Sequence, residues 1–170
     1  STYITDMTID WSTYWKDGQG SDNWPTTWAR NGNVYTSFGD GGGFGRDAED
    51  VAYVSLGFAQ LFGDDGDSLK GRNLIGGLDP TIAQCFPILP GMSPEKLQRP
   101  GHIFPCRNKA PVAKSRSVLA LNNLLYAWLT PGSVTNGYKE GRLFRSSIGK
   151  NNWTQANWAL NRDSSYPLIF

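Results

Sequence analysis

The sequence predicts an all-β protein, on three observations. Glycine and proline, with 20 and 10 of the 170 residues, supply many turn positions. Aromatic residues make up 13% of the chain and include seven tryptophans, which suits strands with broad apolar faces. Short alternating segments separated by turn signals recur along the chain, as they do in all-β folds. A chain of this length can form one domain with a hydrophobic core of its own.

The first elements are expected in the N-terminal third. Residues 2–11 (TYITDMTIDW) alternate weakly and indicate a strand; in a secreted protein this would be a mature N-terminus. Residues 24–41 predict two strands joined at Asn31-Gly32, a strong hairpin signal. Residues 50–62 (DVAYVSLGFAQLF) indicate a further strand, although their apolar spacing also fits a short helix.

Residues 79–111 are expected to form a proline-rich insertion that a disulfide closes. Cys85 and Cys106 bracket a stretch with five prolines and no regular pattern. A disulfide there would contribute roughly 3 kcal/mol through chain entropy and would indicate a secreted protein. Two unpaired buried thiols in a cytosolic protein are the alternative. A glycosylation sequon at Asn152 fits secretion.

The C-terminal part repeats the hairpin pattern. Residues 117–129 predict two strands flanking Asn122-Asn123, and residues 141–160 predict another pair with its turn at 149–152. Residues 164–170 resemble the beginning of a strand. Hairpins that each carry an aromatic residue are typical of β-propeller blades, which take roughly 40–60 residues each. This chain would supply only two to three blades, so either it is part of a longer β-propeller or the fold is a smaller sandwich.

Charge argues against two classes of partner. The net charge is +1 and charged residues make up 18%, so nothing supports a general nucleic-acid or membrane-surface role. No apolar run approaches the length of a membrane-spanning helix. Twelve of the 15 acidic residues lie in residues 1–79, and 11 of the 16 basic ones in residues 80–170. This asymmetry fits either two complementary subregions or an acidic cleft in the first part.

Residues 20–45 resemble the opening of a known family. The chain has Ser-Asp-Asn-Trp-Pro at 21–25, Thr-Trp-Ala at 27–29, Tyr-Thr at 35–36 and Gly-Asp-Gly at 39–41. This pattern resembles secreted microbial five-bladed β-propeller glycoside hydrolases, formerly a domain of unknown function, which include endo-D-arabinanases. The likeness is dense over residues 20–45 and loose over 114–160. It implies that residues 1–170 are the N-terminal portion of a single propeller domain.

The resemblance implies glycoside hydrolysis of a polysaccharide, such as an arabinan or another furanose-rich glycan. That chemistry needs two carboxyl groups, and we expect Asp22 as base or nucleophile and Asp40 as second acid or orienting carboxylate. The glycines around Asp40 would give a ligand access. The proton donor is expected beyond residue 170, since Glu95 and Glu140 fit solvated loop charges better.

Further residues are expected to bind the substrate. They are Asn23, Trp24, Phe44, Lys114 and Arg116. Aromatic rings can stack on sugars or fill a core, and for Trp28 we expect the core. Lys114 and Arg116 alternate, so on an inner strand both would face one side and bind hydroxyl-rich or anionic groups; protective charges on an edge strand are the alternative.

Two other functions and one metal site remain as alternatives. A lectin-like propeller would keep the aromatic residues without the acids, and a polysaccharide lyase would use a base and a cation. His102, in the proline-rich insertion, could serve a lyase. A Ser-His-Asp triad would also depend on it, but no nucleophile-elbow motif accompanies it. No cofactor is expected. Residues 64–67 (DDGD) resemble a fragment of a calcium loop without its bidentate glutamate, so a solvated turn or a structural Ca²⁺ site fits them. The expected partners are a polysaccharide or oligosaccharide and the C-terminal remainder of the propeller.

Overall fold

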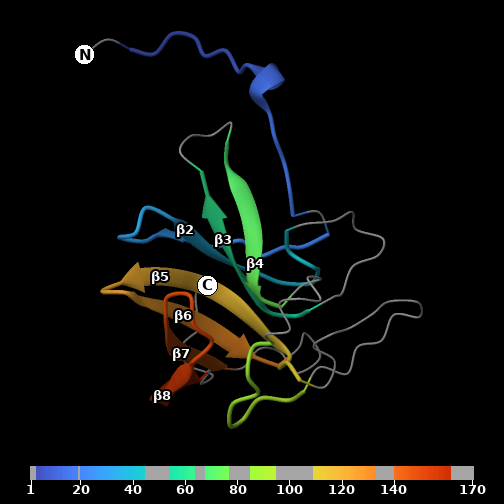
Figure 1. Ribbon diagram of the computed structural model, residues 1–170, viewed down its shortest axis with the longest axis vertical. Coiled ribbons are helices and arrows are strands. Elements are labelled where there is room, and N and C mark those ends of the chain that lie inside the picture. Colours follow the sequence, from blue (N-terminus) through green and yellow to red (C-terminus); the bar gives the residue numbers. More distant parts are fainter. Residues whose placement is uncertain are drawn as a thin grey trace.

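In the part of the chain that the structure describes, the strands form two four-stranded antiparallel sheets (Figure 1). The computed structural model describes residues 3–18, 20–44, 54–63, 68–76, 85–94, 109–132 and 140–161. The strand orders are β1-β2-β3-β4 and β5-β6-β7-β8, so each sheet is a meander of strands that follow one another in sequence. Within these ranges there is no α-helix, and the all-β prediction is confirmed.

The first sheet starts with the predicted hairpin. Its strands are β1 (Thr26–Trp28), β2 (Val34–Phe38), β3 (Gly57–Phe62) and β4 (Lys70–Ile75). Between β1 and β2 the Asn31 Oδ1 atom accepts from the Asn33 backbone N–H at 3.1 Å, and Gly32 has a φ of 81°. The Asn31-Gly32 turn is therefore confirmed, and residues 57–62 form a strand, not a helix.

The second sheet consists of two hairpins. Its strands are β5 (Ala113–Leu121), β6 (Leu124–Pro131), β7 (Glu140–Ser147) and β8 (Thr154–Asn161). Asn122 and Asn123 have φ values of 49° and 61°, as a two-residue hairpin turn with both residues left-handed requires. The side chain of Asn152 closes the β7–β8 connection by accepting from Ser147 N at 2.9 Å. Both predicted turns are confirmed.

The sheets pack face to face, with β1 and β2 against β5 (Figure 1). A hydrogen bond joins them directly, since Ala120 N donates to Thr27 Oγ1 at 2.9 Å. Between the sheets, four aromatic side chains form the centre of the main core: Phe58, Phe86, Phe144 and Trp153. Burying one such side chain stabilises the fold by about 1.5–3 kcal/mol, so this cluster holds the two sheets together.

A smaller core covers the other face of the first sheet. Phe38 and Phe44 are buried there with Val54 and Ala59. Two strand glycines make room for these rings. A Cβ on Gly57 would lie 2.2 Å from Phe38, and one on Gly71 would lie 2.2 Å from Phe44. The first sheet thus packs apolar side chains on both faces, which anchors the segment that follows β2.

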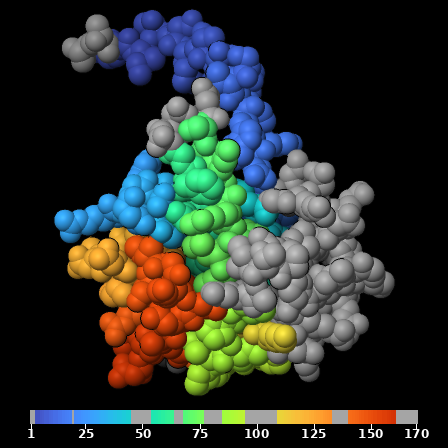
Figure 2. Space-filling view, viewed as in Figure 1, coloured from blue at the N-terminus to red at the C-terminus, as the bar shows by residue number. Residues whose placement is uncertain are grey.

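The N-terminal segment forms no strand, and the predicted strand at residues 2–11 is wrong for its described part. Residues 3–10 have no regular structure, and a single 3₁₀ turn, η1 (Trp11–Thr13), follows them. The segment extends away from the sheets (Figures 1 and 2) and leaves Tyr3, Ile4 and Met7 exposed. Alternation alone makes no strand without a neighbouring strand to pair with.

Part of the proline-rich insertion is described. Phe86 and Met92 are buried in the main core, and Pro94 forms an isolated bridge with Pro111. Cys85 is partly buried and is not a free thiol. Its predicted partner, Cys106, lies outside the described residues, so the pairing stays a prediction. The predicted strand start at 164–170 also lies outside them.

Candidate functional site

Asp22 and Asp40 lie side by side at the end of the first hairpin. The backbone of Asp22 pairs with that of Gly39 through two hydrogen bonds, each 2.8 Å long. Asp40 follows Gly39 directly and so adjoins this bridge. The expectation that both acids lie near the same end of neighbouring strands is confirmed. Two short antiparallel segments, one on each side of the Asn31-Gly32 turn, produce this proximity.

Lys114, from the other sheet, pairs with one of the two acids. It lies in β5, and its Nζ atom forms an ion pair with Asp40 Oδ1. The lysine side chain is 9% exposed and the aspartate side chain 34%. A buried ammonium group needs a nearby counter-charge, which Asp40 supplies. The pair also fixes the orientation of the Asp40 carboxylate relative to the hairpin.

Gly39 lies beside polar groups of Ser55, Lys114 and Asp22. A Cβ at this position would lie 2.9 Å from the carbonyl oxygen of Ser55, 3.3 Å from Lys114 Nζ and 3.4 Å from Asp22 Oδ1. The missing side chain therefore allows the lysine and the Asp22 carboxylate to approach one backbone position. We call Asp22, Asp40 and Lys114 the Gly39 cluster.

The backbone is unusual at two residues of this region. Asp40 has a φ of 53° and Asn23 a φ of 56°, both in the left-handed region that few non-glycine residues adopt. Asparagine and aspartate tolerate this region best, although it costs free energy. Asn23 Nδ2 donates to Asp22 Oδ1 at 2.6 Å. The exposed Asp22 carboxylate is thus oriented by its own neighbour and stays open to solvent.

Arg116 lies close to the cluster but differs from Lys114 in its setting. A β-bulge between Ser115 and Ser117 interrupts the alternation of β5 at this point. Arg116 is partly buried, and its Nε donates to Thr130 Oγ1 at 3.4 Å. Lys114 pairs with the same Thr130 across the sheet. Both basic residues therefore lie near Thr130, and Lys114 is paired with Asp40.

The division of the aromatic residues between core and surface differs from the prediction. Phe44 is only 9% exposed and packs against Trp24, with ring centres 5.0 Å apart. Phe44 is thus a core residue, which does not suit its predicted contact with substrate. Trp24 is partly buried, and its Nε1 donates to Ser21 O at 3.3 Å. Trp28 is 75% exposed, so its predicted place in the core is wrong.

The glycines after Asp40 allow close packing of the segment that carries it. A Cβ on Gly41 would lie 2.1 Å from Gly20 O, and one on Gly43 would lie 2.2 Å from Asn73 Oδ1. The segment 39–44 is therefore pressed against its neighbours. The expectation that these glycines give a ligand access to Asp40 stays a prediction.

Asn73 is a residue that sequence reasoning missed. It is buried in β4, and its Nδ2 donates to Gly42 O at 2.8 Å and to Phe44 O at 3.1 Å. Its Oδ1 accepts from Phe44 N at 2.9 Å. The side chain thereby holds the segment that carries Asp40. The signal available in the sequence was a single asparagine within the segment 70–75, which forms β4.

Other predicted sites lie partly outside the described residues. Asn152 is exposed, but its Oδ1 accepts from Ser146 Oγ at 2.7 Å, so its side chain takes part in the turn. Glu140 forms an ion pair with Arg142 on its own strand. Outside the described ranges are Glu95, His102 and the acids of 64–67. Within those ranges, no group of three potential ligands could hold a metal ion, and no helix has the length and apolarity to span a membrane.

Comparison with known proteins adds no assignment. No family model matches the sequence, and no curated protein matches it either.

Proposed function

We propose that the protein is a glycoside hydrolase that acts on a polysaccharide, such as an arabinan or another furanose-rich glycan, by carboxylate chemistry. One observation carries the proposal. An exposed carboxylate, Asp22, lies beside a second carboxylate, Asp40, which is held by the buried Lys114. Glycoside hydrolysis commonly uses two carboxyl groups at the scissile bond, and the Gly39 cluster supplies two in one place.

The environments of the two acids suggest different roles. Asp22 is exposed and accepts from the Asn23 amide, so it can approach a sugar carbon or a water molecule as nucleophile or base. Asp40 is bound to Lys114 and is therefore assigned as the orienting carboxylate. Lys114, whose side chain is 9% exposed, acts in this proposal on the Asp40 carboxylate and not on the sugar. The proton donor in this proposal lies outside the cluster.

The proposed scaffold is part of a five-bladed β-propeller. Each sheet is a sequential antiparallel meander of four strands, which is the strand order of a blade. The first strands of the two sheets, β1 and β5, lie against each other, as innermost strands of adjacent blades would. On this proposal the Gly39 cluster lies near the propeller axis, where acids from further blades would converge.

We further propose that the protein acts outside the cell with a Cys85–Cys106 disulfide. Cys85 is not a free thiol, and Asn152 is exposed within its sequon. Alkylation of the folded protein with and without prior reduction tests the pairing. Two cysteines that react only after reduction would support it, whereas two that react at once would contradict it.

A carbohydrate-binding propeller without catalysis is the second candidate. The observation that favours it is Trp28, whose large aromatic ring is 75% exposed and free to stack on a sugar. A polysaccharide lyase is less well supported, because Lys114, its expected cation, is buried in an ion pair. Activity and binding assays separate these three classes.

The test uses the protein and its Asp22→Asn variant on arabinans and on uronate polymers. Release of reducing ends from arabinan supports the hydrolase, a new ultraviolet absorbance from uronate polymers would indicate a lyase, and binding alone would indicate a lectin. Asp22→Asn should lower turnover roughly 10²- to 10⁴-fold and leave folding unchanged. Asp6→Asn, which alters an exposed aspartate of the N-terminal segment, is the matched control. Equal turnover by both variants would remove Asp22 from the site.

A further inference from the structure

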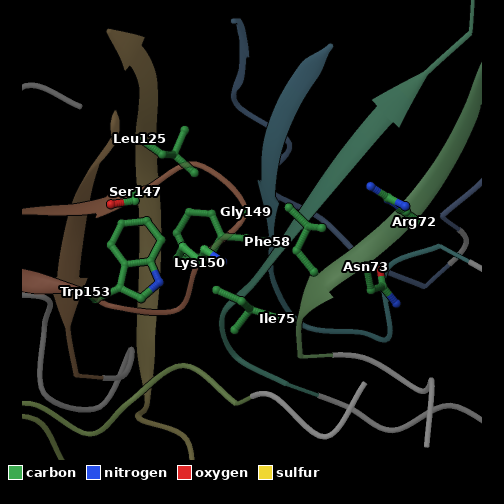
Figure 3. Close-up of a pocket in the computed structure, with 10 residues that line it drawn as sticks. Phe58, Arg72, Asn73, Ile75, Leu125, Ser147, Gly149, Lys150 and Trp153 are labelled. Carbon is green, nitrogen blue, oxygen red and sulfur yellow. The ribbon is translucent and has the colours of Figure 1, made fainter. Parts of the chain in front are cut away.

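A cavity of about 240 Å³ lies between the two sheets and shares no lining residue with the Gly39 cluster (Figure 3). Strands β3 and β4 of the first sheet contribute Phe58 and Ile75 to its wall. The second sheet contributes Leu125 from β6 and Trp153 from the connection before β8. These side chains give the cavity an apolar interior, which suits the body of a small organic molecule.

Trp153 carries an unsatisfied hydrogen-bond donor in this wall. Its side chain belongs to the buried core, with 6% of the residue exposed, and its Nε1 has no hydrogen-bond partner among the described residues. Figure 3 shows the indole nitrogen on the side of the ring that faces Phe58 and Ile75. Buried donors are almost always paired, and an indole nitrogen can only donate. A ligand that completes the site must therefore bring an acceptor.

The charged residues that the structure describes in the wall have one sign. Arg72 and Lys150 line the cavity, and none of the described carboxylates does. The Arg72 Nε and Nη2 atoms donate to Gln60 Oε1 at 3.1 and 2.7 Å, which fixes the guanidinium and leaves Nη1 outside this pair. Lys150 is exposed, and its backbone N–H donates to Ser147 O at 3.0 Å, which holds the turn that carries it. The wall therefore favours an anion over a cation.

We propose that this cavity binds a small apolar carboxylate. The carboxylate accepts from Trp153 Nε1, Lys150 and Arg72 balance its charge, and its hydrocarbon part packs on Phe58, Ile75 and Leu125. The volume suits a compact acid of the size of benzoate. The proposal does not depend on hydrolase activity, because neither the residues nor the chemistry is shared with the Gly39 cluster.

Titration of the ¹⁵N-labelled protein with benzoate tests the proposal. The indole N–H signals of the seven tryptophans are followed, and Trp153→Phe identifies the signal of Trp153. We expect benzoate to shift that signal downfield in a saturable way, and benzylamine, a cation of similar size, to leave it unchanged. Equal shifts with both probes, or no saturable shift with benzoate, would overturn the proposal.

A second comparison holds even if Trp153→Phe does not fold. Lys150→Gln removes an exposed charge at the cavity, and Lys109→Gln removes an exposed charge that does not line it. Lys150→Gln should weaken benzoate binding about threefold, as loss of one exposed ion pair predicts. Lys109→Gln should leave the affinity unchanged. The same affinity in both variants, measured by calorimetry, would contradict the assignment of Lys150.

Discussion

Lys114 in β5 forms an ion pair with Asp40, which follows the last strand residue of β2 by two positions. The pair joins the second sheet to the first, and its partners differ in exposure. The lysine side chain is 9% exposed, whereas 34% of the aspartate side chain is open to solvent. If the pair is broken, water can therefore hydrate the Asp40 carboxylate in part, but it can hardly reach the Lys114 ammonium group.

This asymmetry predicts unequal costs for removing the two charges. Asp40→Asn leaves a buried ammonium group without its counter-charge and should lower the free energy of unfolding by about 3 kcal/mol. Lys114→Met leaves a carboxylate that water still reaches, so about 1 kcal/mol is expected. Urea unfolding measures both, with Lys109→Met as the exposed control. Equal losses in the two variants would contradict the burial argument.

Gly39 should tolerate no side chain. In Gly39→Ala the new Cβ would lie 2.9 Å from Ser55 O and 3.3 Å from Lys114 Nζ, so the backbone at Ser55 and the lysine side chain would have to shift. We expect a loss of stability of about 1–3 kcal/mol and a loss of any activity that depends on the Gly39 cluster. Gly32→Ala is the control, because no atom lies within 4 Å of its added Cβ and only the backbone strain at a φ of 81° remains. A milder effect at Gly39 than at Gly32 would argue against this crowding.

Asn73 should be needed for the segment that carries Asp40. Asn73→Ala removes three hydrogen bonds and leaves buried backbone groups of Gly42 and Phe44 unpaired. Each unpaired buried group costs about 1–3 kcal/mol, so a total loss of about 3 kcal/mol is expected in thermal or urea unfolding. Asn157→Ala, on the exposed surface of β8, is the matched control. An Asn73→Ala variant as stable as the control would show that the segment is held by other contacts.

Local signals explain which parts of the fold could be predicted from the sequence. The turns at Asn31-Gly32 and Asn122-Asn123 depend on the conformational preferences of two adjacent residues, and both are as predicted. The strand expected at residues 2–11 depended on a distant partner strand, about which alternation carries no information. Trp28 was expected in the core and is exposed, whereas Phe44 was expected to contact substrate and is buried. The reason is the same, since the sequence does not say which face of a sheet is covered.

The candidate site was predictable in part. Asp22 and Asp40 come together because one local hairpin returns the chain, and the hairpin was visible in the sequence. The pairing of Asp40 with Lys114 was not visible, because it depends on how one sheet packs on the other across a long separation in sequence. The role of Asn73 likewise depends on a segment that is close only in the folded chain.

Asp10 caps the 3₁₀ turn η1 by accepting a hydrogen bond from Ser12 N, and it should lose this interaction in acid. Hydrogen bonds from the Ser12 hydroxyl and, second, from the Ser12 backbone N–H lower the pKa of this exposed carboxyl below its usual value of 3.8. A lowered folded-state pKa means that the interaction is present above the unfolded value and is lost as pH falls through the folded one. The amide signal of Ser12 should therefore shift with a midpoint below 3.8, and an Asp10→Asn variant should show no such titration. A midpoint above that value would contradict the assignment.

The β5–β6 turn offers a stabilising substitution. Asn123 has a φ of 61°, a conformation that glycine adopts without the steric cost that a side chain imposes. Asn-Gly is the preferred pair for this two-residue turn, so Asn123→Gly should raise the free energy of unfolding by about 0.5 kcal/mol. Asn123→Val, with a branched side chain at the same left-handed position, should lower it by more than 1 kcal/mol, on the order of the known strain at such sites. Urea midpoints compare the two variants with the parent protein, and a stability unaffected by valine would show that the turn does not keep its left-handed geometry in solution.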